Sequence, residues 1–259
     1  MSRLIDKLNK TNKSAAQPMG FRTSRSEEEE ASLIIIASAD TDAPDKIGEY
    51  TAGADAVYLT AQGAGLSAET VKDIIKALAV PCGMDAKAAG KKKPDDFIKA
   101  GGDFLVLPAE SPVELIPEDE KTGKLLRIDP GIEDSLARVI NNLPVDAVIT
   151  TEITGKEKTI TWQHLMNIQR LAMLITKPVI IPVAASVTSR ELKAIRDADI
   201  GGILVAADAG EPGRIERIRR DIKGLPPRSE KKRGKSDVLL PHSAGPTEAE
   251  IPEEDDDDY

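Results

Sequence analysis

Eight short aliphatic runs recur along the central part of the chain, and an amphipathic segment with helical periodicity follows each run. The runs are Leu33–Ala39, Ala56–Ala61, Pro81–Ala86, Phe104–Pro108, Leu125–Ile128, Ala147–Thr151, Val179–Ala184 and Ile203–Ala207. The helical segments span residues 43–52, 67–79, 94–100, 111–120, 132–142, 161–176, 188–198 and 212–223. Because predicted strands and helices alternate, the strands should be parallel and the helices should be their crossover connections. The pattern predicts one α/β domain over residues 31–225.

Eight strand–helix units in a segment of this length predict a compact (β/α)8 TIM barrel. The alternative is a doubly wound open sheet, which needs a glycine-rich phosphate-binding turn after its first strand. The segment Ala37-Ser38-Ala39-Asp40-Thr41-Asp42 follows the first run and contains no glycine. The closed barrel is therefore the preferred prediction.

Composition narrows the classes of protein and site. Aromatic residues make up only 3% of the chain, so the core must be aliphatic. The single cysteine, Cys82, excludes a disulfide framework, and two histidines argue against a histidine-rich metal centre. The net charge of −9 excludes a basic nucleic-acid-binding protein, and no apolar run is long enough for a membrane span. A cytoplasmic protein without nucleic-acid partners is expected.

The two ends of the chain differ in charge from each other. Residues 1–30 form a basic arm, in which residues 2–10 can form a helix with Leu4, Ile5 and Leu8 on one face. This helix could cap a barrel end, remain a loose arm or attach to a membrane surface. Residues 226–259 are poor in apolar residues and end in an acidic run, which predicts a disordered tail that either solubilises the chain or binds a partner.

Candidate site residues follow from the barrel prediction, because active sites of such barrels lie at the C-terminal ends of the strands. Residues two apart in a strand share a face, and we take the polar parity as inward. The residues of this parity are Ser38, Asp40, Tyr58, Thr60, Gln62, Asp85, Lys87, Glu110, Arg127, Asp129, Thr150, Glu152, Ser186 and Asp208. Asp85, Lys87, Arg127 and Glu152 are the predicted catalytic residues, since they end or interrupt apolar strands.

Each of these residues has alternative roles. An arginine inside the barrel needs anionic partners, and for Arg127 these are either lumen carboxylates or a bound anion. Lys87 could form a Schiff base, could act beside Asp85 as an acid or anion-binding group, or could simply begin the solvated run Lys91–Lys93. The acids Asp40, Glu110, Asp129 and Asp208 could hold Mg²⁺, or they could be loop-starting residues and helix caps.

The last two units, residues 178–208, run from a proline through an aliphatic strand, small residues and a Ser/Thr-started helix to a Gly-aliphatic strand. This run resembles the end of the aldolase-type, ribulose-phosphate-binding barrels. The resemblance implies a phosphate held by the last two loops, here by Ser186, Thr188, Ser189, Gly210, Gly213 and Arg214. This chain has Ala184-Ala185-Ser186 where that group has paired glycines, and it adds Asp208 and Glu211. Asp85-Ala86-Lys87 resembles the Asp-x-Lys of the orotidine-phosphate decarboxylase group.

Three functions remain open from the sequence. The first is a lyase or isomerase acting on a small phosphorylated or carboxylated metabolite. The second is a non-catalytic barrel that serves as a binding or assembly module, and the third is a barrel that binds FMN through its phosphate. A homo-oligomer is compatible with each of them. An open pocket lined by Asp85, Lys87, Arg127 and Glu152 would favour the enzyme, whereas a lumen closed by salt bridges would favour the binding module.

Overall fold

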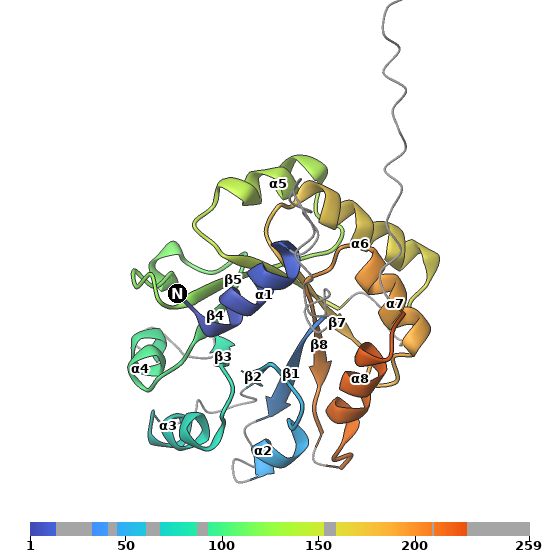
Figure 1. Cartoon of the computed structure of the whole chain (residues 1–259). Helices are drawn as coiled ribbons and strands as arrows, with labels where there is room; N and C mark the ends of the chain where they lie inside the picture. Colours follow the sequence, from blue (N-terminus) through green and yellow to red (C-terminus); the bar gives the residue numbers. More distant parts are fainter. Residues whose placement is uncertain are drawn as a thin grey trace, which may run out of the picture. The chain divides into compact units, whose positions relative to one another are not determined.

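The computed structural model of the chain describes residues 1–13, 33–40, 46–60, 68–86, 93–152, 159–208 and 210–226. The chain divides into a compact unit of residues 1–228 and a second unit of residues 229–259. The compact unit is a closed barrel of eight parallel strands that follow one another in chain order (Figure 1). The predicted TIM barrel is therefore confirmed. Most of the basic arm and nearly all of the acidic tail lie outside the described residues.

The strands begin and end within two residues of their predicted bounds. They are β1 (Ile34–Asp40), β2 (Ala56–Thr60), β3 (Cys82–Asp85), β4 (Phe104–Pro108), β5 (Gly123–Ile128), β6 (Ala147–Thr150), β7 (Val179–Val183) and β8 (Gly202–Ala206). The barrel closes because β1 pairs with both β2 and β8, with Ile36 opposite Ala56 and Leu204. All eight strands point their carboxyl ends to the same end of the barrel, which we call the mouth.

Helices cover the outside of the barrel, as Figure 1 shows. They are α2 (Ile47–Tyr50), α3 (Ala68–Ala77), α4 (Lys93–Lys99), α5 (Asp134–Val139) continued by the 3₁₀ turn η4 (Ile140–Asn142), α6 (Trp162–Leu174), α7 (Ser189–Asp197) and α8 (Arg214–Lys223). The helix predicted over residues 111–120 is wrong, since only the 3₁₀ turn η3 (Val113–Leu115) forms there. Pro117 explains this difference, because a proline disfavours the helical conformation of the residue before it, and Ile116 is extended.

Side chains inside the barrel form a cluster separate from those between strands and helices. The inner cluster includes Ile36, Tyr58, Phe104, Leu125 and Ile149. Gly83 also lies on the inner face, where a β-carbon would come within 2.1 Å of the Phe104 ring. The absence of a side chain at residue 83 therefore makes room for the Phe104 ring in the lumen.

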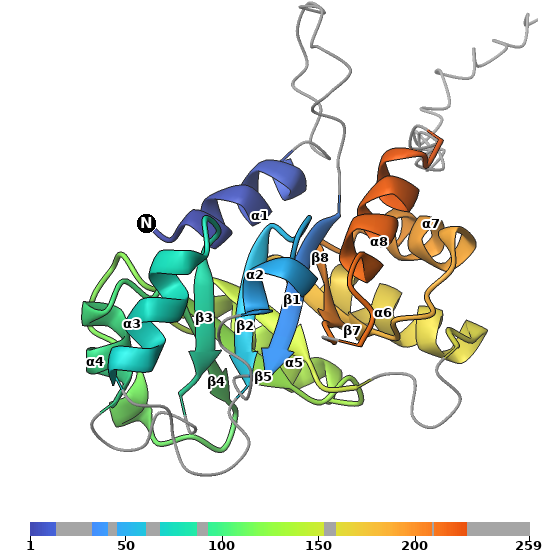
Figure 2. The ribbon, with the colours of Figure 1, turned by 90° about the horizontal axis from the view of Figure 1, so that it is seen from below.

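The N-terminal helix α1 (Arg3–Lys13) closes the end of the barrel opposite the mouth (Figure 2). Leu4, Ile5 and Leu8 are at most 1% exposed and belong to the inner cluster, so the apolar face of α1 packs into this end of the barrel. Asp103 fixes the start of α1, because its carboxylate accepts hydrogen bonds from the Arg3 and Leu4 amides at 2.8 and 3.0 Å. These amides have no partner within the helix, and a carboxylate there also suits the helix dipole.

Candidate functional site at the barrel mouth

Three polar side chains from three strands meet in the lumen near the mouth. Arg127 on β5 donates from Nη1 to Oδ2 of Asp85 on β3 at 2.8 Å. Its Nη2 donates to the hydroxyl of Tyr58 on β2 at 2.5 Å, and that hydroxyl lies 3.4 Å from Asp85 Oδ2. The structure thus brings together Asp85 and Arg127, two of the four predicted catalytic residues. Tyr58 had the inward parity in the sequence but no predicted role.

The side chains of Tyr58, Asp85 and Arg127 fix one another's orientation and protonation. The Arg127 guanidinium carbon lies 5.6 Å from the centre of the Tyr58 ring, within the range of a cation–π contact. Burial raises the pKa of the Tyr58 hydroxyl above its usual value near 10, against the opposing effect of the Arg127 charge. Tyr58 is therefore protonated at neutral pH and can accept from Arg127 while donating to Asp85. Asp85 and Arg127 retain 17% and 27% side-chain exposure, so the group is reachable from the mouth.

The inward parity predicted for the sixth strand is wrong. Ala147 and Ile149 belong to the inner cluster, whereas Val148 packs in the outer cluster beneath the helices. Thr150 shares the outward parity and is buried, and its hydroxyl has no hydrogen-bond partner. Glu152, two residues further on, is exposed. Neither residue joins the Tyr58–Asp85–Arg127 group, and Lys87 lies outside the described residues.

The four acids considered for Mg²⁺ do not form a metal-binding set. Among the described residues, no three His, Cys, Asp or Glu side chains are placed to hold a metal ion. Asp129 and Asp208 instead accept hydrogen bonds from the backbone amides of Gly131 and Gly210, at 2.6 and 2.8 Å. These two acids start loops, which was the alternative role that the sequence left open.

The predicted phosphate-binding residues on the seventh unit surround the N-terminus of α7. Thr188 caps this helix, since its hydroxyl oxygen accepts from the Glu191 amide at 3.3 Å. The Glu191 carboxylate accepts in return from the Thr188 amide and hydroxyl, both at 2.8 Å, and from the Ile160 amide at 2.8 Å. These bonds lower the pKa of Glu191 although burial alone would raise it. The Glu191 carboxylate therefore already occupies the Thr188 amide at this helix start, while Ser186 and Ser189 stay exposed.

The eighth unit shows a similar arrangement. Gly213 caps α8 with a positive φ of 89°, a conformation that glycine adopts without strain. Arg214 donates from Nε to Glu211 Oε2 at 3.0 Å and from Nη1 to the Ala206 carbonyl at 3.3 Å. The carboxylates of Glu191 and Glu211 disfavour a second anion beside them, whether it is a metabolite phosphate or the phosphate of FMN. The phosphate site therefore stays a prediction. The residues at these two helix starts do not fit the phosphate of FMN.

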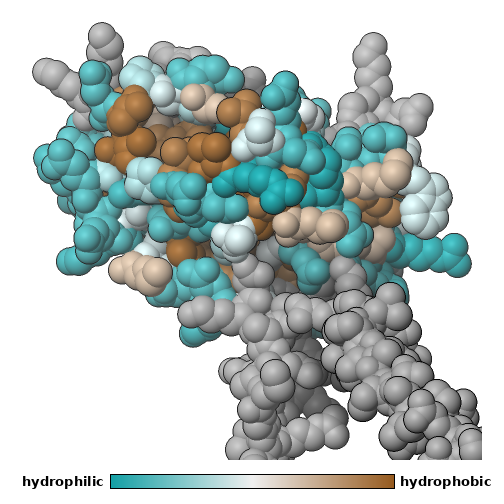
Figure 3. Space-filling model, turned by 90° about the horizontal axis from the view of Figure 1, so that it is seen from above, coloured by the Kyte–Doolittle hydropathy of each residue, from teal (hydrophilic) through white to brown (hydrophobic). Residues whose placement is uncertain are grey.

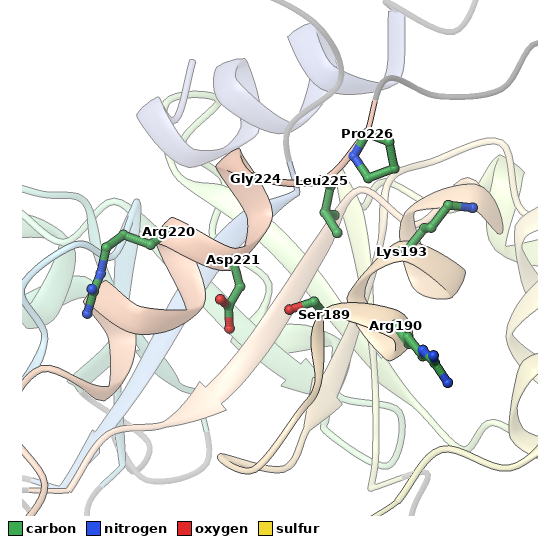
Figure 4. A pocket seen from close by; sticks show the side chains of 8 residues that line it. All are labelled: Ser189, Arg190, Lys193, Arg220, Asp221, Gly224, Leu225 and Pro226. Atoms are coloured by element: carbon green, nitrogen blue, oxygen red, sulfur yellow. The ribbon is translucent and has the colours of Figure 1, made fainter.

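A surface groove of about 360 Å³ lies between α7 and α8 (Figure 4). Its lining residues are Ser189, Arg190, Lys193, Arg220, Asp221, Gly224, Leu225 and Pro226. Figure 4 shows that the Arg220 side chain points away from the groove, and Lys193 pairs with Asp197 at 2.8 Å.

The described part of the chain contains no helix of the length and apolarity that crossing a bilayer requires.

Comparison with known proteins identifies the fold. No family model and no curated protein sequence matches the chain. The tryptophan synthase α-subunit of the hyperthermophile Pyrococcus furiosus matches in structure, with a TM-score of 0.58 and 15% sequence identity over 74% of this chain and 97% of that one. The tryptophan synthase complex of the same organism matches with a TM-score of 0.56 and 15% identity, over 75% of this chain and 98% of that one. The chain therefore shares the (β/α)8 TIM-barrel fold of these two structures.

Proposed function

We propose that the barrel binds a small carboxylated or phosphorylated metabolite at its mouth and acts on it as a lyase or isomerase. The observation that carries this proposal is the placement of Arg127 beside Asp85 in the lumen. A guanidinium has five N–H donors, and the hydrogen bonds of Arg127 to Asp85 and Tyr58 use two of them. The donors that remain suit the planar recognition of a carboxylate or a phosphate.

The neighbouring groups supply the chemistry that such reactions need. Many lyases and isomerases move a proton next to a carbonyl or carboxylate group, and a positioned carboxylate can accept that proton. Asp85 is held by Arg127 at the mouth and would take this role, with Tyr58 fixing the orientation of both. Lys87 comes two residues after Asp85 in the sequence, which is the spacing of residues on the same face of a strand. Lys87 would be a second acid or anion-binding group. Glu152 remains a proposed second acid or base.

Ligand binding is tested first, by thermal unfolding of the full chain with small mono- and dicarboxylates, sugar phosphates and inorganic phosphate. A ligand at about 100 times its Kd should raise the unfolding free energy by about 2.7 kcal/mol and hence Tm by several degrees. Arg127→Gln should abolish the shift, whereas the exposed Arg190→Gln should keep it. A shift that is produced only by phosphates and lost in Arg214→Gln would place the anion at the last loops instead. If no compound shifts wild-type Tm, the proposal fails.

Catalysis is tested separately from binding. A bound ligand is incubated with the protein in D₂O, and NMR follows the loss of its acidic C–H signal. Asp85→Asn should slow this exchange at least about 100-fold, within the range of general base catalysis, while still binding the ligand. A ligand that binds wild type without exchange or turnover would contradict the lyase or isomerase assignment.

A non-catalytic binding module is the second candidate, and one observation favours it. The Asp85 carboxylate already neutralises Arg127 inside the lumen, as a purely structural ion pair would. In that case Arg127→Gln should lower stability without changing any ligand shift, and no exchange should occur in D₂O. The two experiments above therefore separate the two functions.

A further inference from the structure

α6 exposes three large apolar side chains on one stripe. Trp162, Met166 and Met173 are 83%, 58% and 78% exposed. Their spacings of four and seven residues place them above one another along the helix. Buried residues such as Ile168 and Leu171 hold the opposite side of α6 against the barrel. The exposed stripe is therefore additional to the apolar surface that α6 needs for folding.

The neighbouring α5 segment extends this apolar surface. Leu136, Val139 and, just after η4, Leu143 are 54%, 51% and 40% exposed, and α5 contacts α6. Figure 3 views the protein from above with respect to Figure 1, where α5 and α6 lie uppermost, and shows apolar side chains gathered between hydrophilic ones. We call these six residues the α5–α6 face. Large apolar side chains that gather on neighbouring helices mark an interaction site more often than singly scattered ones do.

The charge of this region indicates which partner it fits. α6 contains no acidic residue and no lysine, although 31% of the chain is charged and the net charge is −9. Its one arginine, Arg170, is engaged by Asp134 and by the Pro130 and Ile132 carbonyls. Two copies of an acidic protein repel each other where their acidic surfaces meet, so a neutral face is where they can approach.

The α5–α6 face is also complementary to itself. Glu133 is the N-cap residue of α5, and Arg138 lies in the last turn of this helix. In a two-fold arrangement the same patch meets itself, and antiparallel α5 helices would bring acids opposite Arg138 and oppose their dipoles. A stable interface buries about 800 Å² per partner, and a face about 20 Å long and two helices wide supplies the apolar centre of one. We propose that the protein forms a homodimer through the α5–α6 face.

The single tryptophan of the chain reports on this proposal, because Trp162 lies in the proposed interface. Wild-type protein is diluted from about 100 μM to 0.1 μM, a range chosen to span micromolar affinity. Sedimentation analysis and tryptophan emission are then compared. The dimer predicts a mass that halves on dilution, with Trp162 emission shifting to the red over the same range. A monomer at every concentration, with unchanging emission, overturns the proposal.

A matched pair of variants locates the interface. Met166→Glu places a carboxylate against its own copy, and like charges in an interface cost enough to raise the dimer Kd at least about tenfold. Val113→Glu is the control, since Val113 is 78% exposed on η3 and is not part of the α5–α6 face. Circular dichroism checks that both variants are folded. Met173→Glu is a second variant in the α5–α6 face. If the dimer Kd of both methionine variants equals that of Val113→Glu, the dimer uses another surface and the proposal is contradicted.

Discussion

Arg127 reaches across the lumen from β5 to Asp85 on β3, with Nη1 2.8 Å from Oδ2. β4 lies between these two strands in the barrel, so the ion pair joins alternate strands rather than neighbours. The interior shields the pair on most sides, which strengthens the attraction and makes either partner costly to leave alone. Because the side chains keep some exposure, the pair can hold the barrel mouth in place and still meet a ligand.

The Asp85–Arg127 pair should be coupled energetically. Asp85→Asn and Arg127→Gln should each lower the free energy of unfolding by about 1–3 kcal/mol, since each leaves a poorly solvated partner. The double variant should lose about 1 kcal/mol less than the two single losses together. Urea denaturation measures all four proteins. The exposed pair Lys193–Asp197 is the control and should show a coupling of about 0.5 kcal/mol or less; equal coupling in the two pairs would contradict this expectation.

The closing helix α1 should be a large contributor to stability. Leu8→Ala removes a fully buried side chain at the end of the lumen that α1 closes, and it should lower the free energy of unfolding by about 2–5 kcal/mol. Lys10→Ala, on the exposed side of the same helix, should change stability by less than about 0.5 kcal/mol. Guanidinium denaturation compares the two variants. A small effect of Leu8→Ala would mean that α1 contributes little to the barrel.

Gly83 and Phe104 should show compensating substitutions. Gly83→Ala places a β-carbon within 2.1 Å of the Phe104 ring and should destabilise the barrel by about 3 kcal/mol or more. Phe104→Leu shortens the facing side chain and should recover part of that loss when the two are combined. Tm values of the single and double variants measure this. Losses that simply add would show that the two positions do not compete for space.

Glu191 should make a pH-dependent contribution to stability. Its folded-state pKa is lowered from the ordinary value near 4.5, because the hydrogen bonds from Ile160 and Thr188 outweigh burial. The stabilisation is therefore present above pH 4.5 and is lost as the pH falls through the lowered folded-state pKa. Glu191→Gln should cost about 1 kcal/mol at pH 7 and less at pH 3. Urea denaturation of wild type and Glu191→Gln at pH 7, 5 and 3 tests this, and a loss of stability that stays the same from pH 7 to pH 3 would contradict it.

Cys82 should be unreactive in the folded protein. Burial raises the pKa of its thiol to about 12, so almost no thiolate exists at neutral pH. A thiol reagent should modify the native chain at least about 100-fold more slowly than the chain in denaturant, where one equivalent should react. Because Cys82 is the only cysteine, absorbance of the released chromophore counts the reaction directly. Rapid labelling of native protein would indicate that β3 opens locally.

The predictions that the structure contradicts have local physical causes. Parallel strands are covered on both faces, so the run Ala147–Thr151 gave no alternation from which to read its inner face. The polar residue Thr150 suggested the wrong parity for that reason. The regular alternation of the other units predicted a helix over residues 111–120. Pro117 prevents that helix, because it disfavours the helical conformation of Ile116. The amide of Ile160, just before α6, donates to Glu191 on α7. No pattern in the sequence indicates this contact between two units.

The sequence by itself determined the eight strands, seven of the helices that follow them, the apolar face of α1 and the candidate residues Asp85 and Arg127. These are consequences of short-range periodicity and of polar residues that interrupt apolar strands. Only the tertiary structure decided that Arg127 meets Asp85 and Tyr58, that Glu152 stands apart from them, and that the apolar side chains of α5 and α6 remain uncovered. Barrel closure sets these distances between residues far apart in the chain, and local pattern carries no information about which surfaces closure buries.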